Sequence, residues 1–274
     1  MPNVRALTLL ALIALTGADA HAGKRPNFDV STLAPAPLAT AARPLAAAPV
    51  VVHATDPARG VPTLLWAADP GPAELALRSP VDAARAHLLA HRERWGVPRE
   101  VVDAARPLFT HDTGRGGVIV GLRQRGGDID VFHGDLKVLL GRDNRLIGVA
   151  GAPHPAAVAA AARPFGGTAP AAIAAALGDM HGGRFSAADF VTSARRGPRS
   201  GSHYYDLTPV SSPARGELAF REPARVKPVY FPRGDSLLPA YLVELQVHHT
   251  AKSPLSVHQY VVAADTGALL MRRD

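Results

Sequence analysis

The residues of this chain that could bind a metal ion are histidines, and two of them stand four positions apart in a segment that should be helical. His87 and His91 would share one face of that helix, where two imidazoles can hold one metal ion. The zinc peptidase motif His-Glu-x-x-His has a glutamate base after its first histidine, whereas this chain has Leu88 there. No third ligand is evident. We therefore favour the alternative that both are partly exposed helix histidines.

The other groups that could do chemistry are not arranged for it. His248 and His249 are consecutive in a predicted strand, so they point to opposite sides. Glu244 and Asp265 are separated by strand geometry and form no recognisable acid–base pair. The absence of cysteine excludes thiolate zinc sites and cysteine nucleophiles, and neither a nucleophile elbow nor a Gly-Lys phosphate loop is present. We predict a non-enzymatic chain without a catalytic residue, a cofactor or a metal site.

The segment around His87 is expected to be a helix that packs on a sheet formed by the residues after it. Ser79 can cap the first turn, Pro80 suits the first helical position, and Gly96 ends the helix after Trp95. Alternating apolar residues predict strands over 118–123, 129–140 and 145–152, with tight turns at 125–128 and 141–144. One helix over a curled antiparallel sheet is an α+β unit.

Phe132 interrupts the alternation in the middle strand. It is one position out of step with Ile129 and Val131, so it faces the other side of the sheet. Two interpretations remain open, namely a second packed layer or a contact surface for a partner protein.

A second helix-then-sheet pattern follows. Thr168 caps a helix that has Pro170 in its first turn and ends at Gly182. Strands are predicted over 204–208, 226–231, 238–249, 257–264 and 268–272, the last two joined by the turn Asp265–Gly267. The same plan therefore occurs twice in the chain.

The N-terminus has the order of a secretory signal peptide. Arg5 precedes an apolar run that is too short to span a bilayer, and Ala20 and Ala22 are the small residues of a cleavage site. We expect residues 1–22 to be removed and the protein to be secreted, in the extracellular space or the periplasm. Residues 23–60 are rich in Ala and Pro and predict an extended arm, and Pro62 predicts that the strand after it lies at a sheet edge.

The composition and charge of the chain limit the classes of partner that it can bind. The 274 residues are 47% hydrophobic, which is enough for sizeable cores, and the net charge is +7. Arginines and acids are interleaved, and the densest cluster, Arg195–Arg199, has the composition of a solvated loop, so we expect no nucleic-acid partner. No later segment is apolar enough to cross a membrane. We therefore expect no membrane partner once the signal peptide is removed. Binding of the basic surface to anionic envelope polymers remains an alternative.

The two units together resemble the pro-region of fungalysin-type secreted zinc metallopeptidases. The motifs that carry this resemblance are Gln124, Ile129–Phe132 and Gly134–Val138 in the first unit and Val229–Pro232, Pro239–Glu244 and Asp265–Leu270 in the second. Residues 61–153 are similar to the fungalysin/thermolysin propeptide (FTP) domain, and residues 154–274 to a PepSY-type module. The resemblance implies two cystatin-like units, each with a helix on a curled antiparallel sheet.

The resemblance also implies a function. A pro-region assists the folding of its cognate zinc metallopeptidase catalytic domain and inhibits it until removal, and the residues that could contact this partner are Gln124, Val131, Phe132, Gly134, Asp135 and Lys137. Asp128 stands where the family has Gly, and we expect the hairpin to survive with Asp128 in a left-handed turn position. The sequence contains no His-Glu-x-x-His. The alternatives are a free-standing secreted peptidase inhibitor and an N-terminal fragment of a full precursor.

Overall fold

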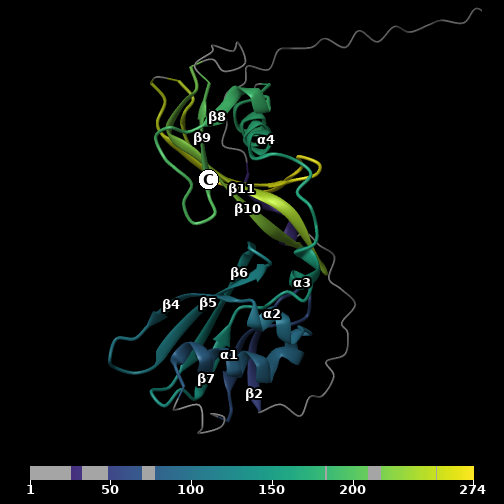
Figure 1. The fold of residues 1–274 in the computed structure, drawn as a ribbon, viewed down its shortest axis with the longest axis vertical. Coiled ribbons are helices and arrows are strands. Elements are labelled where there is room, and N and C mark those ends of the chain that lie inside the picture. The colour runs from purple at the N-terminus through teal and green to yellow at the C-terminus, as the bar shows by residue number, and fades with distance from the viewer. Residues whose placement is uncertain (1–25, 33–48, 70–77, 183, 209–216, 251) are drawn as a thin grey trace, which may run out of the picture.

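The computed structural model describes residues 26–32, 49–69, 78–182, 184–208, 217–250 and 252–274 (Figure 1). Within them the chain is α+β, with four α-helices and one thirteen-stranded mixed sheet, which confirms the predicted class. The expected signal cleavage residues Ala20 and Ala22 lie outside this part. No helix among the described residues has the length and apolar character needed to cross a membrane.

The helices are α1 (Pro80–His91), α2 (Arg99–Asp103), α3 (Ala157–Ala160) and α4 (Ala169–His181), with 3-10 turns η1 (Val30–Thr32), η3 (Arg92–Trp95) and η4 (Ala187–Asp189). The strands are β1 (Phe28–Asp29), β2 (Val50–Thr55), β3 (Pro62–Ala67), β4 (Arg106–His111), β5 (Val118–Gly126), β6 (Ile129–Leu140), β7 (Leu146–Ala150), β8 (Phe190–Thr192), β9 (His203–Leu207), β10 (Ala219–Arg233), β11 (Ser236–His248), β12 (Ser256–Ala263) and β13 (Leu269–Arg273). We call β2 to β7 with α1, α2 and α3 the first half, and β1 and β8 to β13 with α4 the second half.

The first half has one helical layer over an antiparallel sheet in the order β2-β3-β7-β6-β5-β4. Helix α1 begins as predicted, because the Ser79 hydroxyl accepts a hydrogen bond from the Asp82 amide at 3.2 Å. The 3-10 turn after it ends at Gly96, which has a φ of 63°. Leu88 and Trp95 are buried against inward residues of the sheet, so this helix closes the first core.

The hairpin between β5 and β6 survives with a different turn residue than expected. Gly126 pairs with Ile129, which leaves Gly127 and Asp128 as the two turn residues. Gly127 takes the left-handed conformation at φ 56°, and Asp128 does not. The expectation of a left-handed Asp128 was wrong because a glycine, which has no Cβ penalty, precedes it.

The second half has a core on each face of its sheet. Helix α4 is capped by the Thr168 hydroxyl and ends at Gly182, as predicted, and its Ile173 and Leu177 pack on β10, β11 and β12. A further cluster on the opposite face includes Phe231 and Met271. Strand β1 pairs with β13, so the N-terminal end of the described chain lies beside its C-terminal strand.

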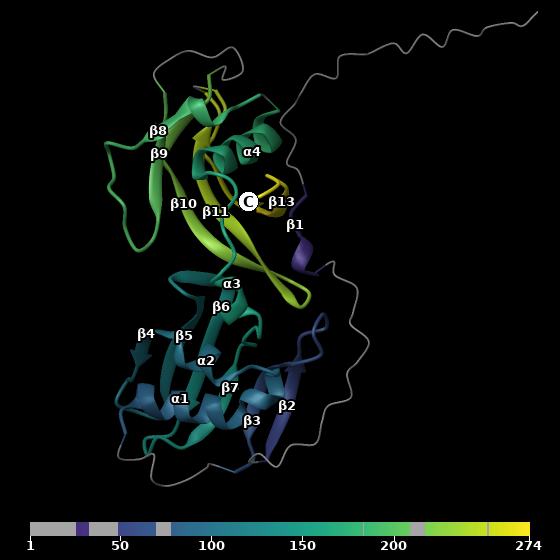
Figure 2. The same cartoon turned by 45° about the vertical axis from the view of Figure 1, so that its right-hand side comes forward.

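The two halves join where hairpin β10–β11 reaches into the first half (Figures 1 and 2). Here β10 and β6 pair in parallel, Val229 with Asp130 and Tyr230 with Val131. The side chains of Tyr230 and Leu237 belong to the core of the first half, although both residues lie in second-half strands. The junction is therefore a hydrophobic contact as well as a strand pair.

Parts of the N-terminal region join the sheet. Within segment 23–60, strand β1 pairs with β13, and strand β2, which contains the β-branched run Val50–Val52, pairs with β3. The expectation that β3 lies at an edge was wrong. Strand β3 lies between β2 and β7 and not at an edge. Pro62 stands at the first position of the strand, where it faces only Thr55, the last residue of β2, because pairing with β7 begins at Leu64.

Replacing Leu237 by Ala should destabilise both halves together, because this side chain is 1% exposed in the first core but belongs to a second-half strand. We expect a loss of about 2–5 kcal/mol in the free energy of unfolding. Urea denaturation followed by the fluorescence of buried Trp95 measures it. Val257→Ala, on an exposed position of β12, is the control and should change stability by less than about 0.5 kcal/mol. A Leu237→Ala protein whose first half unfolds as in the unmodified chain would contradict this.

Candidate protein-binding surface

Four of the six residues expected to contact a partner are instead internal. Gln124 is fully buried, its side-chain amide donates to the His154 carbonyl oxygen at 2.6 Å, and its side-chain oxygen accepts from the His154 amide at 2.9 Å. Val131 lies in the first core. Gln124 thus completes the backbone hydrogen bonds of the segment that leads from β7 to α3.

Gly134 is required by a bulge in β6. The pairing of β5 with β6 shifts between Arg123 and Arg125, and His133 has a φ of 54°. A Cβ on Gly134 would lie 2.9 Å from both Cβ and the carbonyl oxygen of Val131, closer than real Cβ atoms come. The bulge therefore gives Gly134 a structural role.

Phe132 forms the second packed layer, one of the two open interpretations. It is 7% exposed and stacks on Phe231 of β10 with ring centroids 5.6 Å apart. Its other face carries the exposed imidazole of His133, at 3.9 Å between centroids. Phe132 therefore fastens β6 to the second half and does not offer a free surface to a partner.

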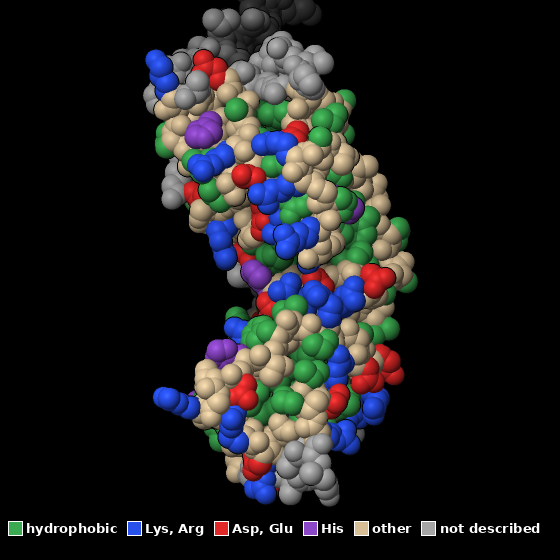
Figure 3. Space-filling model, turned by 60° about the vertical axis from the view of Figure 1, so that its left-hand side comes forward, with side chains coloured by type: hydrophobic (Ala, Val, Ile, Leu, Met, Phe, Trp, Pro, Cys, Tyr) green, Lys and Arg blue, Asp and Glu red, His purple; other side chains and the backbone are tan. Residues whose placement is uncertain are grey.

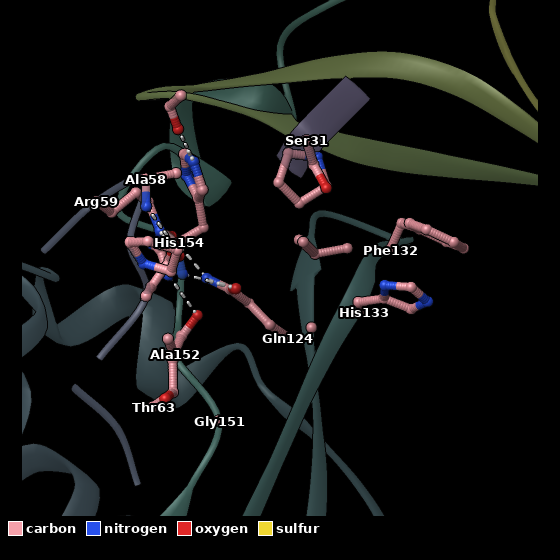
Figure 4. Close-up of a pocket in the computed structure, with 16 residues that line it drawn as sticks. Ser31, Ala58, Arg59, Thr63, Gln124, Phe132, His133, Gly151, Ala152 and His154 are labelled. Carbon is pink, nitrogen blue, oxygen red and sulfur yellow. Dashed lines mark hydrogen bonds and ion pairs between the residues drawn. The ribbon is translucent and has the colours of Figure 1, made fainter. Parts of the chain in front are cut away.

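A cavity of about 450 Å³ lies beside this bulge (Figure 4). The Arg59 guanidinium in its wall donates to the carbonyl oxygens of Ala152 and Pro153 at 2.9 and 3.0 Å and to the Asp56 carboxylate at 3.0 Å. Burial raises the pKa of Asp56, but the hydrogen bonds from Arg59 and neighbouring amides outweigh it and lower that pKa overall. These polar groups are bonded to one another. The cavity wall therefore connects the loop after β2 to the segment after β7 and has a structural role.

Basic side chains also gather at the junction, around the hollow between the two halves (Figure 3). The Asp130 carboxylate, 6% exposed, is bonded to the Lys227 ammonium and lies 3.5 Å from Arg123, 3.6 Å from Arg125 and 3.8 Å from Arg106. The positive charges of these side chains compensate the buried carboxylate. This network joins β6 to β10 across the halves.

The two remaining motif residues, Asp135 and Lys137, are exposed on β6. Asp135 is bonded to Arg123, whereas Lys137 has no ion pair with a described residue. Their side chains project on the sheet face opposite α1, because the alternating Leu136 and Val138 are in the first core.

This sheet face, which we call the outer face, carries exposed apolar groups. Its members are Val51 (52% exposed), Trp66 (37%), Phe109 (43%), Asp135, Lys137 and Ile147 (37%). The Phe109 ring lies over Gly121 and the Trp66 ring over Gly148, where a Cβ would fall 2.4 and 2.9 Å from ring atoms. Among the described residues no helix packs on this face, so aromatic rings stay in contact with solvent. Several large apolar groups exposed on one sheet face are typical of a protein-binding surface.

The histidines considered as metal ligands in the sequence are more buried than expected. His87 and His91 are each 3% exposed, not partly exposed, because α1 turns them toward the sheet and the loop before β7. His87 contacts the Asn144 carbonyl oxygen at 3.0 Å, and burial lowers the pKa of His91 to about 4. His249 faces His181 of α4, with 3.3 Å between their Nδ1 atoms. In the described chain no three His, Cys, Asp or Glu side chains form a group that could hold a metal ion.

Comparison with known proteins adds no relative. Neither the models of known protein families nor the curated proteins contain a match to this chain. The likeness to metallopeptidase pro-regions therefore rests on the motifs themselves.

Sequence reasoning did not find Trp66, Phe109, Arg59 or His154. The first two had a signal, since a strand glycine opposite an aromatic residue marks a ring lying flat on a sheet. Arg59 bonds backbone carbonyl oxygens 94 and 93 residues away, and the ring of His154 contacts one 80 residues away. Nothing in their sequence neighbourhood indicates those partners.

Gln124→Ala should destabilise the chain by about 2–5 kcal/mol, because it leaves the buried amide and carbonyl of His154 without partners. Chemical denaturation measures the change. Lys137→Ala, on the exposed face of the neighbouring strand, is the control and should stay within about 0.5 kcal/mol of the unmodified protein. Equal stability of the Gln124→Ala protein would show that water replaces the side chain and would contradict the structural role.

Proposed function

We propose that this chain is a secreted, non-catalytic module of the propeptide type, which assists the folding of a fungalysin-like zinc metallopeptidase catalytic domain and inhibits it until removal. The observation that carries the proposal is the outer face. A sheet with a helical layer on one side and exposed Trp66, Phe109 and Ile147 on the other has an unsatisfied apolar surface.

The arrangement of the halves supports the same proposal. In the first half α1 covers β5 and β6, and in the second half α4 covers β10, β11 and β12. In the proposal the cores of these halves belong to two cystatin-like units, FTP-like over 61–153 and PepSY-like over 154–274; β1 and β2 lie before the first unit, and α3 follows its end. A module of this kind acts by linkage, since a partner that binds only native-like enzyme stabilises that state and blocks its substrate.

The outer face also suggests how the catalytic domain is held. Aromatic rings near the centre of an interface supply most of its binding energy, and Trp66 and Phe109 are the large aromatic groups on this face. Lys137, without an ion pair among the described residues, adds a positive charge that favours an acidic rim on the partner.

The double variant Trp66→Ser/Phe109→Ser should lose inhibition of a fungalysin-like catalytic domain by at least about thirtyfold, the effect of removing hot-spot side chains. The measurement is the inhibition constant, with the yield of active enzyme after refolding in the presence of the chain as a second readout. Val191→Ser/Val257→Ser is the control, because both valines are equally exposed but lie in the second half. Its inhibition should equal that of the unmodified chain.

Two results would overturn the proposal. One is an unmodified chain, correctly folded, that changes neither the refolding yield nor the activity of such a catalytic domain. The other is a purified chain that hydrolyses peptide substrates unaided.

A further inference from the structure

His154 lies where the segment between β7 and α3 meets the tip of hairpin β10–β11. The imidazole is 2% exposed. Its Nδ1 accepts a hydrogen bond from the Ala156 amide at 3.2 Å, and its Nε2 lies 3.0 Å from the Gly234 carbonyl oxygen. An amide can only donate and a carbonyl can only accept, so Nδ1 must be bare and Nε2 must carry the proton. The neutral Nε2–H tautomer is thus fixed by the backbone around it.

The backbone of His154 is held as firmly as its ring. Gln124 of β5 bonds both its amide and its carbonyl, and Arg59 bonds the two carbonyl oxygens just before it (Figure 4). The backbone of His154 is therefore fixed in place. A change in the protonation of the ring can be accommodated only by rotation of the side chain, which breaks its contacts with the Ala156 amide and the hairpin tip.

The charges facing the ring come from two other segments. Burial, the largest effect, lowers the pKa of His154; its bond to the Gly234 carbonyl raises it. Arg59 in the connection between β2 and β3 lowers the pKa, whereas Asp235 in the hairpin turn and Asp56 beside Arg59 raise it. The balance is a lowered pKa, so the neutral ring belongs to the docked state.

We propose that His154 is an acid-sensitive latch that docks the hairpin tip, Arg233–Ser236, on the first half. A proton added at Nδ1 would face the Ala156 N–H, so that contact changes from a hydrogen bond to a clash of two donors. The same proton places a positive charge in a buried site near Arg59. The ring can relieve both only by moving toward solvent, which takes it from the Gly234 carbonyl and frees the tip.

The direction of the pH effect follows from linkage. A histidine released to solvent titrates near 6.5, and the docked ring titrates below that value. Docking is therefore fully favoured above about pH 6.5 and weakens as the pH falls toward the lower pKa of the docked ring. Within that window opening takes up one proton, so its equilibrium constant rises about tenfold for each pH unit.

Resting on the proposed function, this latch would tie peptidase release to acidification. Tyr230 and Leu237 flank the tip and insert into the first core, so a freed tip loosens the contact between the halves. The first half, which carries the outer face, would then no longer be held firmly against the second half, and the partner would lose a rigid binding surface.

Amide hydrogen exchange on the isolated chain tests the latch without any peptidase. After correction for intrinsic exchange rates, protection over 231–238 and 153–161 should fall about tenfold per pH unit below pH 6.5. In His154→Gln, whose amide can still donate to Gly234 but does not titrate, this fall should be absent. His91→Gln, which removes an equally buried histidine of α1, should keep it.

The tautomer gives a second test that needs no variant. Nitrogen NMR of the unmodified chain at pH 7.5 should show His154 protonated at Nε2 alone, with a pKa below 6.5. An Nδ1–H tautomer, a pKa of 6.5 or higher, or pH-independent protection of the tip would overturn the proposal. Failure to bind a peptidase would overturn the proposed function and leave these results unchanged.

Discussion

The structure depends on one buried amide that closes a break in its own sheet. Where β5 and β6 stop pairing at the bulge, the side chain of Gln124 turns inward and bonds the amide and carbonyl of His154 as another strand would. A buried backbone without these bonds would cost several kcal/mol. The pair therefore decides the path of the chain after β7, and with it where the second half begins.

Two contacts between the halves lie near this bulge. His154 contacts the hairpin tip at Gly234, and Phe132 of β6 stacks on Phe231 of β10. Val131 and Phe132 point to opposite faces, as consecutive strand residues do, so Val131 enters the first core while Phe132 reaches Phe231. The bulge lies between these residues and Asp135, where the pairing of β5 with β6 changes register, so both contacts between the halves lie beside one local irregularity.

Much of this fold was predictable, and the failures have physical causes. Helix ends were found because Ser79, Gly96, Thr168 and Gly182 act locally, within one turn of the residues they cap. The hairpins were found because alternation and turn residues are also local. Strand β1 was missed because its two residues are stabilised by pairing with β13, at the other end of the chain.

The candidate site was harder for the same reason. The order of residues in the motif says nothing about which side chains face solvent. Gln124 and Phe132 look like contact residues in sequence, yet their partners His154 and Phe231 are distant in the chain and bury them. Exposure at Trp66 results from the lack of a covering layer, which only the packing of the whole sheet reveals.

Besides the buried Tyr230 and Leu237 and the Phe132–Phe231 stack, the junction has two unlike polar contacts, and their positions determine how it can open. Asp130 of β6 pairs in register with Val229 and is bonded to Lys227, so this contact lies on the second-half side of the tip. The Gly234 contact lies beyond it, at the turn. A charge pair surrounded by Arg106, Arg123 and Arg125 does not depend on the protonation of an imidazole. Loss of the His154 contact alone would therefore leave the strand pair as a pivot, and the hairpin tip would swing about Asp130 while the halves stay joined.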